Sequence, residues 1–157
     1  PCLYSHQTPE NMKTIVFFSL ILLLTATACS KQGIHAPEGT WKMVRMQMIE
    51  GSKVTDYFSS RYKINQIKMW SGDNFMFVGK YEVDTTTSYR FGVGKFTLKG
   101  NLYTEKIKYH FDPAYEGQSN KIWLEIKNDT LMHIFPVNDV GEPNKTRHWV
   151  EKYVRMQ

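Results

Sequence analysis

The stretch YRFGVGKFTLKGNLYTEKIKY, residues 89–109, indicates the fold class. Apolar and polar residues alternate on both sides of a central Lys99-Gly100-Asn101, which is the pattern of two half-buried strands joined by a tight turn. The same pattern recurs along the chain at nearly even spacing. We expect eight strands, at residues 40–48, 63–70, 74–83, 89–98, 102–109, 121–127, 130–137 and 147–155. No span shows a sustained helical period, and a short helix could form only within residues 52–62.

Eight successive strands joined mostly by short turns favour an all-β protein whose antiparallel sheet closes into an up-and-down barrel. Closure removes both exposed sheet edges, and a two-sheet sandwich is the alternative. The 157 residues suit one domain, and an aromatic content of 14% supplies large side chains for a core or a pocket. An eight-stranded barrel is either filled by side chains or holds one small ligand.

The N-terminal part has the layout of a secretory signal peptide. Residues 12–28 read MKTIVFFSLILLLTATA, with one basic residue, an apolar run and then small residues. Residues 26–29, ATAC, resemble the lipobox of bacterial lipoproteins, which implies cleavage before Cys29 and lipid attachment to it. An ordinary signal peptidase site is the alternative. We expect upstream non-native translation at 1–11, a signal peptide at 12–28, a tether at 29–38 and the barrel at 39–157.

The lipobox resemblance also implies a cellular location. The residue after Cys29 is Ser30 and not the aspartate that retains enterobacterial lipoproteins at the inner membrane. We therefore expect a cell-envelope protein held at the outer membrane by the lipid on Cys29. Whether it faces the periplasm or the cell surface stays open.

The first and last strands of the expected barrel together carry a short sequence signature. Gly39 and Trp41 open the first strand and Arg155 ends the last, so the guanidinium can stack on the indole once these strands are neighbours. This arrangement resembles the signature of lipocalins and the wider calycin group. The segments IKMW (67–70), NFMFV (74–78), GKFTLKGNLYTE (94–105) and KNDTL (127–131) are similar to uncharacterised lipocalin-like lipoproteins of Bacteroidota. The resemblance implies a calycin-type barrel, secreted or membrane-tethered, and no known ligand.

Strand alternation assigns an inner face to the barrel. The candidate ligand-binding residues on it are Phe75, Phe77, Tyr81, Phe96, Tyr103, Glu105 and His133. The same alternation places Tyr109 on this face, with Gly92 and Gly94 opening space beside it. The lysines occupy alternate positions that we expect on the solvated outer face: Lys63, Lys68, Lys80, Lys95, Lys99, Lys106, Lys108, Lys121 and Lys127.

A buried carboxylate needs a partner. Glu105, with His133 or Arg45, is expected either to orient an amphipathic ligand in an aromatic pocket or to complete a satisfied network in a filled core. We expect the protein to bind or carry a small hydrophobic molecule. The alternative is a structural or interaction module that meets an envelope protein or glycan through its longer loops, 110–120 and 138–146, with Phe111 and Tyr115 as anchors.

Several function classes are not expected. The two cysteines, Cys2 and Cys29, precede the expected barrel, so thiol catalysis and cysteine-ligated metals do not fit. The five histidines show no metal-site spacing, and we expect no metal and no cofactor. We expect no catalytic residues; an acid–base pair of Glu105 and His133 is the alternative. The net charge of +5 suits nucleic acid, but export to the envelope argues against that partner.

Overall fold

The computed structural model describes residues 35–59 and 61–157. The expected signal peptide, the expected lipobox and the expected upstream segment 1–11 lie outside the described residues, as do both cysteines. The described residues form one folded unit. No helix within the described residues is long and apolar enough to cross a membrane.

Within that part of the chain, nine strands form one antiparallel sheet. They are β1 (Gly39–Glu50), β2 (Lys53–Asp56), β3 (Tyr62–Ser71), β4 (Asn74–Val83), β5 (Thr86–Lys99), β6 (Leu102–His110), β7 (Ser119–Lys127), β8 (Thr130–Phe135) and β9 (Arg147–Arg155). Their order is β2-β1-β3-β4-β5-β6-β7-β8-β9, and β1 also pairs with β9. All strands except β2 therefore close into a ring, and the predicted eight-stranded up-and-down barrel is confirmed.

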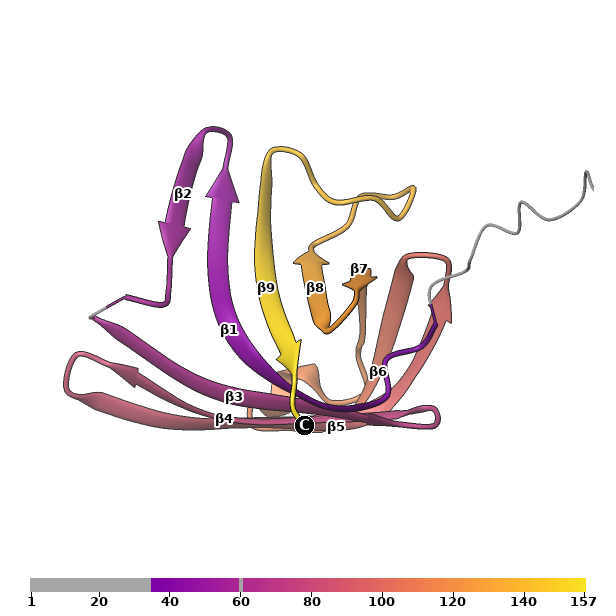
Figure 1. Cartoon of the computed structure of the whole chain (residues 1–157), viewed down its shortest axis with the longest axis horizontal. Coiled ribbons are helices and arrows are strands. Elements are labelled where there is room, and N and C mark those ends of the chain that lie inside the picture. The colour runs from indigo at the N-terminus through magenta and orange to yellow at the C-terminus, as the bar shows by residue number, and fades with distance from the viewer. Residues whose placement is uncertain (1–34, 60) are drawn as a thin grey trace, which may run out of the picture. The chain divides into compact units, whose positions relative to one another are not determined.

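Strand β1 pairs with three neighbours along its length. Its first residues, 39–42, pair with β3, and its last residues, 47–50, pair with β2. Between these regions β1 curves away from β3, as Figure 1 shows. The described residues of 52–62, where a short helix was possible, form no helix, because Lys53–Asp56 pairs as a strand with backbone groups of β1 that β3 no longer reaches.

The other end of the barrel is closed by a packed core. Its fully buried members include Trp41, Trp70, Tyr103, Leu124 and Leu131. The guanidinium carbon of Arg155 lies 4.2 Å from the centroid of the Trp41 ring, and Arg155 Nη1 donates a hydrogen bond of 2.6 Å to the carbonyl of Glu38. The expected stacking of the Arg155 guanidinium, on the last strand, against the Trp41 indole, on the first strand, is therefore confirmed.

A β-bulge in β6 changes which residues face the interior. The β5–β6 register shifts between Val93 and Gly94, and Lys108 is the extra residue. A Cβ atom at Gly94 would lie only 2.1 Å from the carbonyl oxygen of Lys106, so the bulge requires glycine there. Beyond the bulge the alternation is inverted. Tyr109 is 53% exposed, which corrects its predicted inward direction, and His110 turns inward instead.

Candidate ligand-binding site

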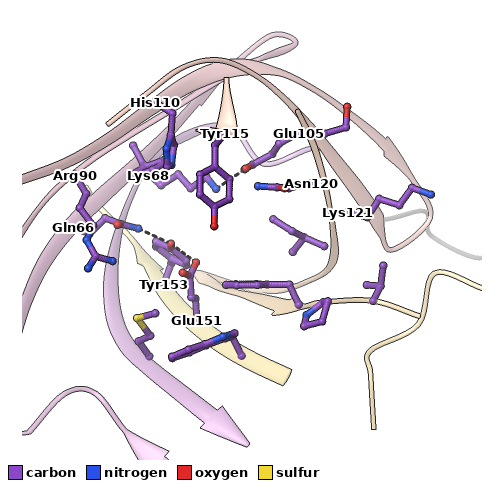
Figure 2. A pocket seen from close by; sticks show the side chains of 18 of the residues that line it. Gln66, Lys68, Arg90, Glu105, His110, Tyr115, Asn120, Lys121, Glu151 and Tyr153 are labelled. Atoms are coloured by element: carbon purple, nitrogen blue, oxygen red, sulfur yellow. Dashed lines mark hydrogen bonds and ion pairs between the residues drawn. The ribbon is translucent and has the colours of Figure 1, made fainter. Parts of the chain in front are cut away.

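A cavity of about 780 Å³ occupies the open end of the barrel. Every strand of the closed ring contributes to its wall, and the loops after β6 and β8 form its mouth. The apolar and aromatic lining consists of Met46, Phe77, Tyr81, Phe111, Tyr115, Ile122, Phe135, Pro136, Val137, Trp149 and Tyr153. The charged or polar lining consists of Gln66, Lys68, Arg90, Glu105, His110, Ser119, Asn120, Lys121, Asn138, Asp139 and Glu151. Figure 2 shows several of these side chains converging on the cavity.

A buried ion pair lies where the cavity meets the core. Lys68 Nζ is 2.5 Å from Glu105 Oε1, and each side chain is only 6% exposed. The predicted outward direction of Lys68 was wrong, because Lys68 shares the inner face of β3 with Gln66 and Trp70. The ammonium also lies 5.2 to 5.9 Å from the centroids of four aromatic rings, those of Trp70, Phe75, Phe77 and Tyr103. Attraction to the carboxylate and to these rings offsets the desolvation of the ammonium.

Of the two partners predicted for Glu105, His133 or Arg45, Arg45 was wrong. Arg45 lies on the exposed side of β1, where its Nε is 3.4 Å from Asp56 Oδ2. The pair Arg45–Asp56 links β1 to β2. Lys68 is the residue that neutralises Glu105.

A chain of side-chain hydrogen bonds runs along the cavity wall. Tyr81 Oη donates to Gln66 Oε1 at 2.5 Å, and Gln66 Nε2 donates to Tyr153 Oη at 2.8 Å. Tyr153 Oη donates to Glu151 Oε2 at 2.7 Å. Burial raises the pKa of both Tyr81 and Tyr153, so their hydroxyls remain protonated donors. The cavity wall is therefore held in one arrangement before any ligand arrives.

Glu151 is the acceptor at the end of this chain. Burial alone would raise the pKa of its carboxyl, but His133, Lys68 and the Tyr153 hydroxyl outweigh burial and lower that pKa overall. His133 Nδ1 lies 3.7 Å from Glu151 Oε2. Glu151 is thus an ionised carboxylate whose charge is already engaged by neighbouring side chains.

His133 belongs to the core and not to the cavity wall. Its ring lies among those of Trp70, Tyr103 and Tyr153, at centroid distances of 5.8, 5.4 and 5.5 Å. Burial and the charge of Lys68 lower the pKa of His133, so the imidazole is neutral near pH 7. Its Nε2 atom has no hydrogen-bond partner among the residues that the structure describes.

The mouth of the cavity is framed by stacked aromatic rings. The His110 ring packs against Phe77, Phe111 and Tyr115, with centroids 5.9, 4.4 and 4.8 Å away. Gly92 allows this arrangement, because a Cβ atom there would lie 2.3 Å from the Phe77 ring. Tyr115 ends the single-turn 3₁₀ helix η1 (Pro113–Tyr115) in the loop that follows β6.

The structure divides the residues predicted to bind a ligand into two groups. Phe77, Tyr81 and Glu105 line the cavity. The other four, Phe75, Phe96, Tyr103 and His133, are buried beneath it and are absent from its lining.

The sequence analysis missed Lys68, Arg90, His110 and Trp149. Arg90 and Trp149 lie at inward-facing positions of their strands, so the alternation of residues could have identified both. Lys68 was assigned to the outer face because of its charge, and the inward direction of His110 depends on the bulge. No group of three or more His, Cys, Asp or Glu side chains within the described part of the chain could hold a metal ion.

Comparison with known families assigns the barrel to a family. A family model described as "Domain of unknown function (DUF4488)" matches residues 37–157, which span the whole barrel. The chain therefore belongs to the DUF4488 family. No curated protein matches it.

Proposed function

We propose that this member of the DUF4488 family binds or carries one small, largely hydrophobic molecule in the open end of its barrel. The observation that carries the proposal is the cavity of about 780 Å³, whose wall combines apolar and aromatic residues with an equal number of charged or polar ones. Small-molecule sites usually have volumes of about 300–1,000 Å³ and combine apolar and aromatic walls with polar groups that orient the ligand. Function through binding fits this wall better than acid–base catalysis, because Glu105 is engaged by Lys68 and His133 lies in the core.

The polar wall also supports binding. Gln66, Tyr81, Tyr153 and Glu151 already satisfy one another through hydrogen bonds, so a ligand does not have to order them. A wall ordered in advance lowers the entropic cost of association. The aromatic groups Phe77 and Trp149 then supply the apolar contact area.

We further propose that the protein is a lipocalin-like lipoprotein of the Bacteroidota, tethered to the outer membrane. The up-and-down topology and the stacking of Arg155 on Trp41 support the lipocalin-like assignment. The signal-peptide pattern and the lipobox ending at Cys29 support the tether. Cys29→Ala should move the protein from the membrane fraction to the soluble fraction, and continued membrane retention would contradict lipidation.

Filling the cavity tests the binding proposal. Asn120 lies on the wall, points into the cavity in Figure 2, and makes no side-chain hydrogen bond within the described residues. Asn120→Trp should place an indole in the space that the ligand needs. Asn65→Trp is the matched control, because Asn65 is exposed on β3 and does not line the cavity.

The readout is the fluorescence of N-phenyl-1-naphthylamine, a neutral hydrophobic probe. The original protein and the Asn65→Trp control should bind it alike, and Asn120→Trp should weaken binding by about tenfold or more, which corresponds to about 1.4 kcal/mol. Equal affinity of all three proteins would show that the probe does not use the cavity.

The alternative is an interaction module that works through its mouth loop. Phe111 and Tyr115 favour it, because they are 39% and 44% exposed and large aromatic side chains are typical anchors in interfaces. A protein that carries no ligand and ignores the probe would support this alternative.

A further inference from the structure

Arg90 is a cation held in a defined position on the cavity wall. It lies on the inner face of β5 and is half-buried. Its guanidinium carbon is 4.2 Å from the centroid of the Tyr81 ring and 5.5 Å from that of Phe111. A guanidinium stacked on an aromatic face keeps its N–H donors, which lie in the guanidinium plane, available to another group.

No carboxylate uses those donors. Within residues 35–59 and 61–157, Arg90 forms no ion pair and its side chain makes no hydrogen bond. Glu105 is paired with Lys68, and Glu151 accepts a hydrogen bond from Tyr153 and lies beside His133. The third carboxylate of the lining, Asp139, is on the exposed loop after β8.

We propose that Arg90 binds the anionic head group of the ligand, a carboxylate, sulfonate or phosphate attached to an apolar body. This inference rests on the proposed function and specifies its ligand class. The planar fork of a guanidinium matches such oxyanions with two parallel hydrogen bonds, and charge-assisted bonds of this kind are stronger than neutral ones. A ligand without the anion would leave the donors of Arg90 without a protein or ligand acceptor.

The apolar body of the proposed ligand can contact apolar side chains on the opposite side of the barrel. In the ring of eight strands, β9 lies four places from β5 and therefore opposite it. Strand β9 contributes Trp149 to the cavity, and the neighbouring β8 contributes Phe135. Figure 2 shows Arg90 at one side of the cavity, with Lys121 at the far side. The ligand thus extends from Arg90 across the cavity toward Trp149 and Phe135.

Two fluorescent probes with the same aromatic body separate charge from hydrophobicity. N-Phenyl-1-naphthylamine is neutral, and 8-anilino-1-naphthalenesulfonate adds one sulfonate. Both are titrated into the full chain, into Arg90→Gln and into a control, Arg147→Gln. Arg147 suits the control because it is an exposed arginine outside the cavity lining that pairs with Glu50 at 3.0 Å.

The original protein and Arg147→Gln should prefer the sulfonate probe. Arg90→Gln should weaken that probe by about ten- to a hundredfold and leave the neutral probe within about twofold. Equal weakening of both probes, or no weakening of either, would overturn the role of Arg90. If the original protein binds the neutral probe without preferring the sulfonate, this inference fails and the proposed function stands. If it binds neither probe, the proposed function fails.

A second variant distinguishes a loss of binding from a loss of folding in Arg90→Gln. Arg90→Lys keeps the charge but not the planar fork, so it should lose less affinity for the sulfonate probe than Arg90→Gln does. An equal loss in both variants, with unchanged thermal unfolding, would contradict a charge-based contact.

Competition then identifies the head group. Dodecanoate, dodecyl phosphate and dodecanol carry the same chain and are used to displace the bound neutral probe. Displacement by dodecanoate or by dodecyl phosphate that weakens in Arg90→Gln supports the proposal and names the anion. Displacement by dodecanol as strong as that by both anions would overturn it.

Discussion

The two ends of the barrel use the same strands and similar side chains for different purposes. Phe75 and Phe77 are two residues apart on the inner face of β4, yet Phe75 is 2% exposed within the core whereas Phe77 lines the cavity. At the closed end, large rings fill the interior. At the open end, where β1 has curved away from β3, rings such as that of Phe77 line a cavity instead. The alternation of residues along a strand therefore decides which face of the barrel a residue occupies. The position of the residue along the strand decides whether it lies in the packed core or lines the cavity.

The ion pair of Lys68 and Glu105 marks the boundary between these regions. Above it the lining is partly polar, and below it the core is dominated by Trp70, Phe75 and Tyr103. Removing one partner of an ion pair at this depth is strongly destabilising, because the other partner is left as an uncompensated buried charge. If the closed end is a packed core and the open end is a cavity, substitutions in the two regions should differ in their effects on stability and on binding.

The largest effect is expected when one member of the buried pair is removed. Lys68→Met leaves Glu105 buried without a cation and should lower the free energy of unfolding by about 3–5 kcal/mol, measured by urea denaturation. The control is Lys95→Met, whose lysine pairs with Asp73 on the exposed surface and should unfold like the original protein. A stable Lys68→Met protein would mean that the pair contributes little to folding.

The two phenylalanines of β4 compare core with cavity directly. Phe75→Ala should cost about 3–5 kcal/mol because it leaves a void in a packed region. Phe77→Ala should cost about half as much or less, since one side of its ring already faces the cavity, and it should weaken binding of the neutral probe. Equal losses of stability would contradict the division of the barrel into a filled and an open end.

The pH dependence of stability should report on His133. Because burial lowers its pKa in the folded state, the unfolded chain takes up a proton that the folded chain refuses, so acid favours unfolding. Stability should fall as the pH drops below about 6.5, the usual pKa of histidine, by up to about 1.4 kcal/mol per pH unit. His133→Gln should flatten this dependence between pH 5 and 7. An unchanged slope would show that His133 is not the group responsible.

The smallest effect is expected at the closing contact of the barrel. Arg155→Gln removes the guanidinium stacked on Trp41 and should cost about 0.5–1 kcal/mol, because the contact is partly exposed. Thermal unfolding is the measurement. A loss as large as that of Phe75→Ala would mean that this contact, and not the filled core, secures the closed end.

Much of the fold could be predicted from the sequence because alternation and turn residues are local signals. The eight barrel strands, the inner faces of β4 and β5 and the contact of Arg155 with Trp41 all followed from them. Tyr109 was misplaced because a single extra residue, Lys108, inverts the alternation without changing the pattern of residue types. The strand β2 was missed because its pairing depends on where β1 leaves β3.

The candidate site was harder to predict because it depends on contacts between distant residues. Lys68 was expected outside, since an unpaired lysine is rarely buried. Its partner Glu105 lies 37 residues further along the chain, and no local pattern connects the two. The same limit explains why Tyr103 and His133 were expected at the ligand, although they lie below the cavity.

The most direct test of the central claim is native mass spectrometry with lipid extraction. The original protein and Asn120→Trp are purified in parallel from the envelope of the organism that makes them. The account predicts a stoichiometric small molecule on the original protein that is lost in Asn120→Trp, where the indole occupies the cavity. An identical molecule on both proteins, or none on either, would contradict the claim that the open end of the barrel is a ligand-binding site.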